Sequence, residues 1–528
     1  MRTLTKVGLA VLSGLLIAAA WPVRGLAPLA FVAFIPLLYL QDRSRGIFLL
    51  SYITFAVWNT LTTWWVWKTT AFGTIGMILL NSLFMTTVFW AYHFVKTRLY
   101  DNKKGYYLLI IFVLAFEYLH LNWQLNWPWL NLGNVFSHYH TWVQWYSITG
   151  IAGGTLWVLA ANILIYKFLL ASFRPQRSGV EKSSVFYAII LLLILFIPLI
   201  ISKIMYFSYE ERGDDVEIVV VQPNLDPYSE EFTFSAPKIL QRNLSVAAPL
   251  VTEKTRFVVS PESAIQENIW LERISNYFSI RELRKFLKEY PQTCYVIGVS
   301  AYGLAPDDSE NDFAARKFYD ADKYFYAYNT ATLITKDSIQ TYHKSRLTPG
   351  AESMPSWWIM RMFKNSAIDL GGTVGTLKKD TEAKTLSFDN HQVATLICYE
   401  SVFGEYVTEF VKKGADMLFV ITNDGWWGNS PGHKQHLEFS KLRAIETRRD
   451  VARSANTGIS GFINQRGDIV KQSKYWEHTA LRGTLKANTE QTFYVRYGDY
   501  IYKIAVFLTA LLAAMTMVRL IIKKRKNA

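Results

Sequence analysis

Cysteine is the rarest residue in this chain, with two positions, Cys294 and Cys398, among 528 residues. So few thiols exclude a disulfide framework. The sequence also lacks internal repeats and low-complexity tracts. A free cysteine is commonly a small buried core residue, and Cys294, inside an apolar run, is predicted to be one. Any chemical role for Cys398 must therefore be argued from its neighbours.

Charge is also sparse, since only 19% of the residues are charged while 51% are hydrophobic. The length excludes a single ordinary domain. Residues 1–208 are predicted to form a transmembrane domain of about seven spans, 209–498 a folded domain, and 499–528 a last span with a basic tail. About eight apolar stretches approach the length needed to cross a bilayer. These stretches are 5–21, 27–41, 47–67, 73–95, 105–120, 143–171, 185–205 and 501–522.

Lysine and arginine are absent from the connecting segment 121–142, whereas they flank both ends of the chain. The positive-inside rule then predicts that both termini are cytoplasmic and that 210–498 lies outside the cytoplasm. Residues 1–20 also resemble a signal peptide. A retained anchor is favoured because a second apolar stretch follows at once. The net charge of +14 is thus attributed to topology, and no nucleic-acid partner is expected.

Short β-rich runs alternate with helical patterns between residues 210 and 498, which predicts a layered α/β domain. The predicted strands are Val216–Gln222, Arg256–Ser260, Cys294–Ser300, Asn329–Thr335, Gln392–Cys398, Asp416–Thr422 and Ser454–Asn464. The predicted helices are Ala236–Leu250, Ile280–Tyr290, Glu405–Lys413 and His433–Arg449.

Three reactive side chains follow predicted strands. Glu262 comes after the run ending at Pro261, Lys344 follows a strand, and Cys398 ends another. Functional groups gather beyond the carboxyl ends of strands in open α/β sheets. A carboxylate can accept the thiol proton, and an ammonium can stabilise both a thiolate and an oxyanion. Glu262, Lys344 and Cys398 therefore form a set sufficient for acyl transfer.

Several further segments of the outer domain follow in a set order. They are Pro261-Glu262, the Lys344 loop, Cys398-Tyr-Glu400, Ile421-Thr-Asn-Asp-Gly-Trp-Trp-Gly428, Arg443-Ala-Ile-Glu446 and Ala452–Ser460. Taken in this order, they resemble the nitrilase (carbon–nitrogen hydrolase) superfamily. The membrane half adds Phe116-Glu-Tyr-Leu-His120, Asn126–Asn134 and Ile148–Gly154. These membrane segments narrow the resemblance to the apolipoprotein N-acyltransferase family.

The resemblance implies an αββα sandwich outside the cytoplasm, with Cys398 as nucleophile, Glu262 as general base and Lys344 as stabiliser of the tetrahedral intermediate. It also implies supporting or substrate-binding roles for a second group of residues. This group comprises Glu352, Asn329, Tyr399, Glu400 and Trp426.

The implied reaction moves an acyl chain from a membrane phospholipid, through a thioester on Cys398, to the N-terminal amine of diacylglyceryl-cysteine in a bacterial lipoprotein. Phosphatidylethanolamine is the expected donor and a diacylated apolipoprotein the acceptor. No cofactor and no metal are expected. The resemblance places the enzyme in the bacterial inner membrane, with its catalytic domain on the periplasmic side.

Two other functions remain open at this point. One is a membrane-tethered amidase, in which water attacks the thioester. The other is a non-catalytic scaffold or transporter, which the lack of a clear series of ionisable residues within the spans disfavours. His433 and His436 are spaced like metal ligands but lack a third, so we interpret them as structural, like the pair Arg443 and Glu446. The segment 354–362 is open to two interpretations, a lipid-dipping lid or a buried loop.

Overall fold

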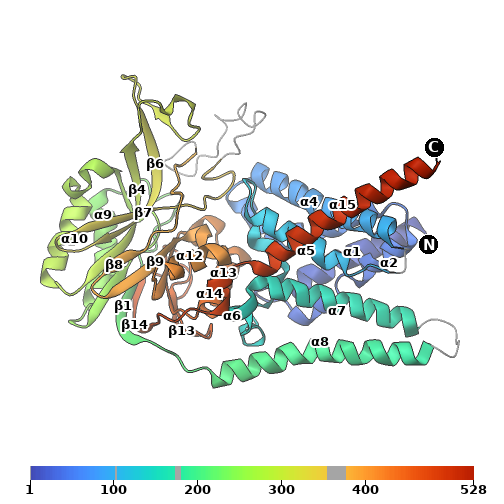
Figure 1. The fold of residues 1–528 in the computed structure, drawn as a ribbon. Coiled ribbons are helices and arrows are strands. Elements are labelled where there is room, and N and C mark those ends of the chain that lie inside the picture. The colour runs from blue at the N-terminus through green and yellow to red at the C-terminus, as the bar shows by residue number, and fades with distance from the viewer. Residues whose placement is uncertain (1, 101–103, 173–179, 354–375, 528) are drawn as a thin grey trace. The chain divides into compact units, whose positions relative to one another are not determined.

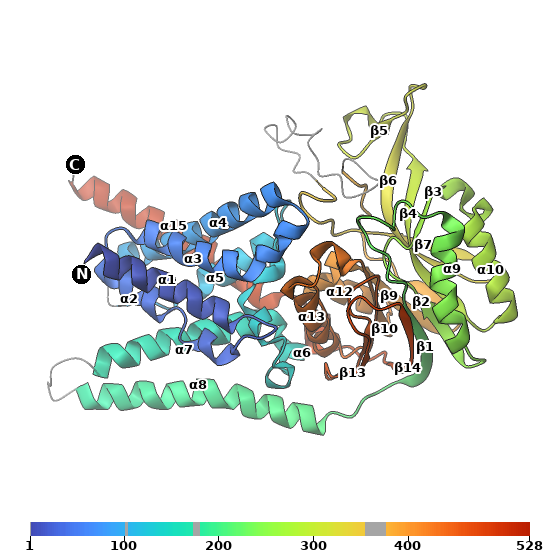
Figure 2. The ribbon, with the colours of Figure 1, turned by 180° about the vertical axis from the view of Figure 1, so that it is seen from behind.

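The computed structural model describes residues 2–100, 104–172, 180–353 and 376–527. The segment 354–362, predicted as a lid or a buried loop, lies outside the described residues. The chain divides into two compact units (Figures 1 and 2). A helical unit comprises Met1–Trp67, Ala71–Ser208 and Tyr497–Ala528, and an outer unit comprises Lys68–Thr70 and Tyr209–Arg496.

Apolar helices make up the helical unit. Six helices in its described part are long and apolar enough to cross a membrane, and each overlaps one of the predicted stretches. The stretch 27–41 instead forms a short 3-10 helix and then α2, each with proline in its first turn, and 105–120 forms the 14-residue α5. The helices are α1 (Thr3–Ala20), α2 (Ile35–Arg43), α3 (Ile47–Thr63), α4 (Ala71–Leu99), α5 (Leu108–Leu121), α6 (Tyr146–Thr149), α7 (Ile151–Ser172), α8 (Val180–Ser208) and α15 (Tyr500–Asn527).

The predicted span 143–171 was too long at its start, because α7 begins only at Ile151. Gly150 separates α7 from the short α6 with φ 58° and ψ −168°, a backbone conformation that favours glycine. The helical turn of α6 therefore cannot continue directly into the long helix.

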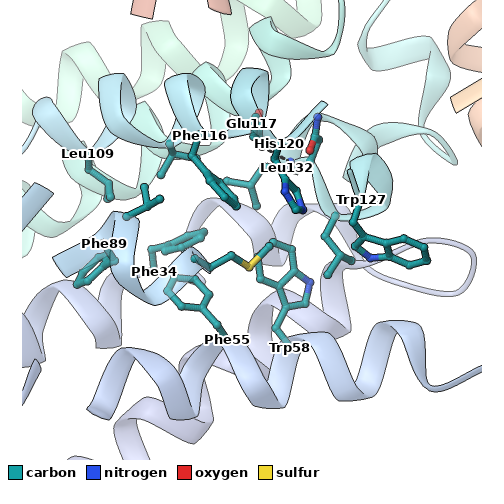
Figure 3. Close-up of a pocket in the computed structure, with 15 residues that line it drawn as sticks. Phe34, Phe55, Trp58, Phe89, Leu109, Phe116, Glu117, His120, Trp127 and Leu132 are labelled. Carbon is teal, nitrogen blue, oxygen red and sulfur yellow. Dashed lines mark hydrogen bonds between the residues drawn. The ribbon is translucent and has the colours of Figure 1, made fainter. Parts of the chain in front are cut away.

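A buried carboxylate joins four segments of the helical unit. On α5, Glu117 Oε1 accepts a hydrogen bond from the backbone N–H of Leu132 at 2.7 Å. Its Oε2 accepts from Thr155 Oγ1 on α7 and from the Tyr502 hydroxyl on α15, both at 2.8 Å. Glu117 also borders a mostly apolar pocket of about 30 Å³, into which the ring of His120 projects among aromatic side chains (Figure 3).

Two β-sheets form the centre of the outer unit. The first has the order β14-β1-β2-β4-β6-β5, with β3 paired to β4 and β7 to β6; the second has the order β13-β12-β11-β10-β9-β8. The first contains β1 (Asp214–Gln222), β2 (Thr255–Val259), β3 (Ile265–Trp270), β4 (Cys294–Leu304), β5 (Arg316–Lys317), β6 (Tyr324–Ile334), β7 (Ile339–His343) and β14 (Thr479–Ala487). The second contains β8 (Leu386–Phe388), β9 (His391–Ile397), β10 (Met417–Thr422), β11 (Val451–Ala455), β12 (Gly461–Ile463) and β13 (Ile469–Gln472).

Helices cover the outer face of each sheet, and the two inner faces pack against each other (Figure 1). Helices α9 (Ala236–Ala247) and α10 (Phe278–Glu289) lie on the first sheet, while α12 (Gly404–Lys412) and α13 (Pro431–Thr447) lie on the second. Between the sheets, the rings of Phe257 and Phe419 have centroids 5.1 Å apart. The predicted layered α/β arrangement is confirmed, in the order helices, sheet, sheet, helices.

The four predicted helices of the outer unit are confirmed within about two residues, apart from the end of the first, where α9 gives way to a 3-10 turn. The predicted strand Ser454–Asn464 is wrong. This range contains the end of β11, the turn 456–460 and all of β12, and the two strands pair antiparallel around the turn. Asn456, Thr457 and Gly458 favour this turn, and Gly458 lies so close to Asp424 that an added Cβ would be 2.9 Å from its carboxylate.

Candidate active site

Glu262 leaves the first sheet just after β2, where the chain passes very close to β4. The backbone N–H of Gly298 on β4 donates to the carbonyl oxygen of Pro261 at 3.0 Å. A Cβ at position 298 would lie 2.6 Å from the Cα of Glu262, so this approach requires glycine. The buried Glu262 carboxylate accepts hydrogen bonds from Asn329 Nδ2 at 2.7 Å and from the backbone N–H of Asn423 at 3.1 Å.

Lys344 directly follows β7, and its backbone N–H donates to the carbonyl oxygen of Asn329 on β6 at 2.8 Å. Its Nζ lies 3.1 Å from Glu262 Oε1 and 2.8 Å from Glu352 Oε1. Burial alone lowers the pKa of Lys344, but the two carboxylates outweigh it and raise that pKa well above its usual value. The Lys344 side chain therefore stays protonated, and its ammonium group contacts both carboxylates.

Glu352 and Asn329 complete this cluster. Asn329 Nδ2 donates to Glu352 Oε1 at 3.0 Å as well as to Glu262, so one amide spans both carboxylates. Burial raises the pKa of Glu352, yet the Lys344 ammonium holds it below its ordinary value. Glu352 thus remains a carboxylate that keeps Lys344 charged and fixed.

Cys398 stands at the first residue after β9 and has φ +50°, in the left-handed region that non-glycine residues rarely adopt. Such strain is typical of functional positions. Burial, together with the charge of Glu262, raises the pKa of the Cys398 thiol well above its usual value, although Lys344 opposes this. At rest Cys398 is therefore a thiol, and a thiol needs a base within reach before it can act as a nucleophile.

These residues line one cavity of about 320 Å³ within the outer unit. Parallel β9 and β10 pair Ile397 with Ile421, so Cys398 and Asn423 leave the second sheet at the same edge. Of the sequence-predicted site residues, six line the cavity, namely Glu262, Asn329, Lys344, Glu352, Cys398 and Trp426. Sequence reasoning missed several other lining residues, among them Glu231, Phe232, Tyr302, Tyr328 and Asn423.

Tyr399 and Glu400 do not line the described cavity. Tyr399 packs against Phe403, with ring centroids 5.1 Å apart. Glu400 is fully buried, and its Oε1 accepts from the backbone N–H of Ser345 at 2.7 Å, while its Oε2 accepts from that of Ile397 at 2.8 Å. Glu400 therefore ties the residue after Lys344 to the residue before Cys398.

A second buried network lies against Cys398. Potential ligand atoms of Cys398, Asp424 and His436 fall within 4.8 Å of one another, as in a metal site. However, Asp424 Oδ2 pairs with an Arg453 guanidinium nitrogen at 2.5 Å, and Asp424 Oδ1 lies 2.9 Å from His436 Nδ1. A guanidinium in this position repels a cation, so the contacts favour a structural role for His436.

Cys294 and the pair Arg443 and Glu446 lie apart from the cavity lining. Cys294 is fully buried at the start of β4, as expected of a core residue. Arg443 contacts Glu446 at 2.8 Å and donates to the carbonyl oxygen of Val402 at 2.7 Å, which supports the predicted structural role.

Two family descriptions match the chain. "Apolipoprotein N-acyltransferase N-terminal domain" matches residues 13–164, and "Carbon-nitrogen hydrolase" matches residues 220–494, which is more than half of the sequence. The chain belongs to the carbon–nitrogen hydrolase family. Its apolar helices and its amino-terminal match make it a membrane protein within that family.

Curated relatives cover almost the whole chain. An apolipoprotein N-acyltransferase of Chlorobaculum tepidum is 27% identical over 534 residues, covering 97% of this chain and 96% of the relative. One of Geobacter metallireducens is 28% identical over 542 residues, covering 98% and 95%. Among solved structures, a carbon–nitrogen hydrolase superfamily protein from Xanthomonas campestris is 14% identical, with a TM-score of 0.36, and covers 52% of this chain and 91% of its own.

Proposed function

We propose that this chain is an acyltransferase that moves an acyl chain from a membrane phospholipid to the N-terminal amine of a diacylated bacterial lipoprotein. One observation carries the proposal: a thiol, a carboxylate and an ammonium share one cavity in a chain that resembles apolipoprotein N-acyltransferases over nearly its full length. The relatives' names supply the reaction class, and the cavity supplies groups able to perform it.

In the first half-reaction, Glu262 removes the proton from Cys398 as the sulfur attacks the ester carbonyl of the phospholipid. The Lys344 ammonium stabilises the oxyanion of the tetrahedral intermediate. When the intermediate collapses, the C–O bond breaks, and the lysophospholipid oxygen receives the proton from Glu262. An acyl thioester remains on Cys398.

In the second half-reaction, the neutral amine of the acceptor attacks the thioester carbonyl. Glu262 takes a proton from the attacking nitrogen, and Lys344 again stabilises the oxyanion. The C–S bond then breaks, and the proton returns from Glu262 to the sulfur. The amide leaves, and the enzyme regains its starting protonation state.

The membrane arrangement is part of the same proposal. The distribution of lysine and arginine supports an inner-membrane protein with both termini in the cytoplasm and the outer unit on the periplasmic side. Because both substrates are lipids anchored in the bilayer, a membrane-bound enzyme suits them, and phosphatidylethanolamine is the proposed donor.

The test incubates the purified full chain with a phospholipid that carries a labelled acyl chain. Label should appear on wild-type protein in a thioester that hydroxylamine cleaves, and should be absent from Cys398→Ala. A chase with a diacylated lipopeptide should then release labelled amide faster than water releases labelled fatty acid. Equal labelling of Cys398→Ala would contradict the proposal, and release by water alone would favour the amidase alternative.

A further inference from the structure

The catalytic cavity contains a carboxyl group that the proposed mechanism does not use. Glu231 lies in the turn between β1 and α9, where its backbone N–H donates to the carbonyl oxygen of Asp226 at 3.0 Å. The residue is only 2% exposed, yet it lines the cavity beside Glu262. Its Oε2 accepts a hydrogen bond from Asn423 Nδ2 at 2.6 Å, while the backbone N–H of Asn423 donates to Glu262. Asn423 therefore donates hydrogen bonds to both Glu231 and Glu262 and holds the two carboxyl groups on the same side of the cavity.

The charges that line the cavity are unequal. Among the described residues that line the cavity, three carboxyl groups face one ammonium, and Lys344 contacts Glu262 and Glu352. In the described part of the chain, Glu231 forms no ion pair with a basic residue. Burial, with a contribution from the Glu262 charge, accordingly raises the pKa of Glu231 to about 8. A cation entering the cavity would offset both effects and ionise Glu231.

Two further features of the cavity suit a cation that carries N–H groups. Aromatic side chains form part of its wall, and the rings of Phe232 and Trp426 have centroids 6.2 Å apart beside Glu231. Aromatic faces attract cations. The side-chain oxygen of Asn329 is a buried acceptor without a hydrogen-bond partner, on a residue that is only 7% exposed. A guest that donates hydrogen bonds would satisfy this oxygen.

We propose that Glu231 forms a subsite for a primary ammonium group inside the catalytic cavity. This inference rests on the proposed function and deepens it. Two substrates of the proposed reaction carry a primary ammonium group: the lipoprotein acceptor at its N-terminus, and a phospholipid donor with an ethanolamine headgroup. In either case Glu231 acts as a positioning and specificity residue, and Glu262 remains the base for the attacking nitrogen. A bound acceptor ammonium first gives one proton to the Glu231 carboxylate, which leaves the neutral amine that attacks the thioester. An acylated amine is an uncharged amide, so the subsite holds the substrate and releases the product.

A binding experiment tests the subsite without catalysis. The Cys398→Ala protein is titrated with a diacylated lipopeptide and its N-acetylated twin, and separately with phosphatidylethanolamine and phosphatidylglycerol. We expect the ammonium-bearing member of at least one pair to bind about tenfold more tightly, as a charged hydrogen bond in a buried site allows. Adding Glu231→Gln should abolish that preference, whereas Glu231→Asp should retain part of it.

Glu230→Gln is the matched control, because Glu230 lies on the same turn but does not line the described cavity. It should keep the full preference. Loss of the lipopeptide preference in Glu231→Gln assigns the subsite to the acceptor, and loss of the phosphatidylethanolamine preference assigns it to the donor headgroup. Equal binding within both pairs, or a preference that survives Glu231→Gln, overturns the inference.

A kinetic experiment separates this inference from the proposed function. With Cys398 intact, Glu231→Gln should slow one ammonium-dependent step by about tenfold. The step is either transfer to the lipopeptide or acylation by phosphatidylethanolamine. Cleavage of the thioester by hydroxylamine, an uncharged nucleophile at neutral pH, should match wild type. A wild-type protein that forms no thioester contradicts the proposed function, and the binding experiment then still decides on the subsite.

Discussion

Two buried glutamates, one in each unit, have the same side chain and nearly the same burial but different surroundings. Glu117 is 3% exposed and accepts hydrogen bonds from three uncharged donors on three segments. Glu262 is 7% exposed, contacts the Lys344 ammonium and lines a cavity that also contains the Cys398 thiol. The first arrangement joins helices, while the second can exchange a proton with a guest. Partners, and not burial, distinguish the carboxylate that joins helices from the one that we propose as the catalytic base.

The isosteric change Glu262→Gln should have the largest effect on activity. It removes the proposed base while preserving the side-chain shape, so the rate of thioester formation on Cys398 should fall by about 10² to 10⁴-fold. Single-turnover labelling with a phospholipid measures this rate. Glu117→Gln is the matched control and should label at the wild-type rate per folded molecule. If both variants labelled equally well, the contrast between the two glutamates would have no functional meaning.

Glu400→Gln should give an intermediate result, because Glu400 supports the site without lining the described cavity. The burial of Glu400 raises its pKa to about 7, and its two oxygens bind the backbones beside Lys344 and Cys398. An amide offers only one acceptor oxygen, so one of these links weakens. We expect the rates of both half-reactions to fall about tenfold with unchanged KM, and the unfolding free energy to fall by about 1–3 kcal/mol. A change in KM alone would contradict this positioning role.

The sequence predicted the strand-end positions of Glu262 and Cys398, because apolar runs that stop at a polar residue mark strand ends. Lys344 was expected after the strand 329–335, whereas it directly follows β7, which the sequence did not predict. The sequence could not predict the positive φ of Cys398, because a non-glycine residue gives no sign of this conformation in the sequence. Glu231 was missed because it lies in a polar turn, where a carboxylate is ordinarily solvated. In the folded protein Glu231 is instead buried and hydrogen-bonded to Asn423, which is distant in the sequence.

Strand β14 is another feature that could not be predicted from the sequence. Its sequence mixes Arg482, Gly483 and Lys486 with apolar residues, so it lacks the apolar run of a buried strand. It is nonetheless paired along its full length with β1, antiparallel, at the edge of the first sheet. Edge strands tolerate charged residues and are therefore difficult to recognise from composition. β3, β5, β7, β8 and β13 were also missed, and β5 has only two residues.

Glu117→Gln should affect stability more than activity. The amide can accept from Leu132 or from the hydroxyls of Thr155 and Tyr502, but it cannot present two carboxylate oxygens to all three donors. We expect the unfolding free energy in detergent to fall by about 1–3 kcal/mol. Thr155→Val removes one donor and should produce a smaller loss in the same direction. Unchanged stability in Glu117→Gln would mean that the carboxylate is not the group that joins these helices.

Asp424 adds a third buried carboxylate to the comparison, and its cationic partner is the Arg453 guanidinium. Burial raises its pKa, but Arg453 and His436 outweigh this and hold the pKa of Asp424 well below its usual range. A lowered folded-state pKa stabilises the fold above the unfolded pKa, near 3.9, and this stabilisation is lost as the pH falls further. Below about pH 4, wild type should therefore lose about 1.4 kcal/mol per pH unit more than Asp424→Asn. Denaturant unfolding at several pH values measures the two slopes. Parallel slopes would show that Arg453 pairing does not make this carboxylate acid-sensitive.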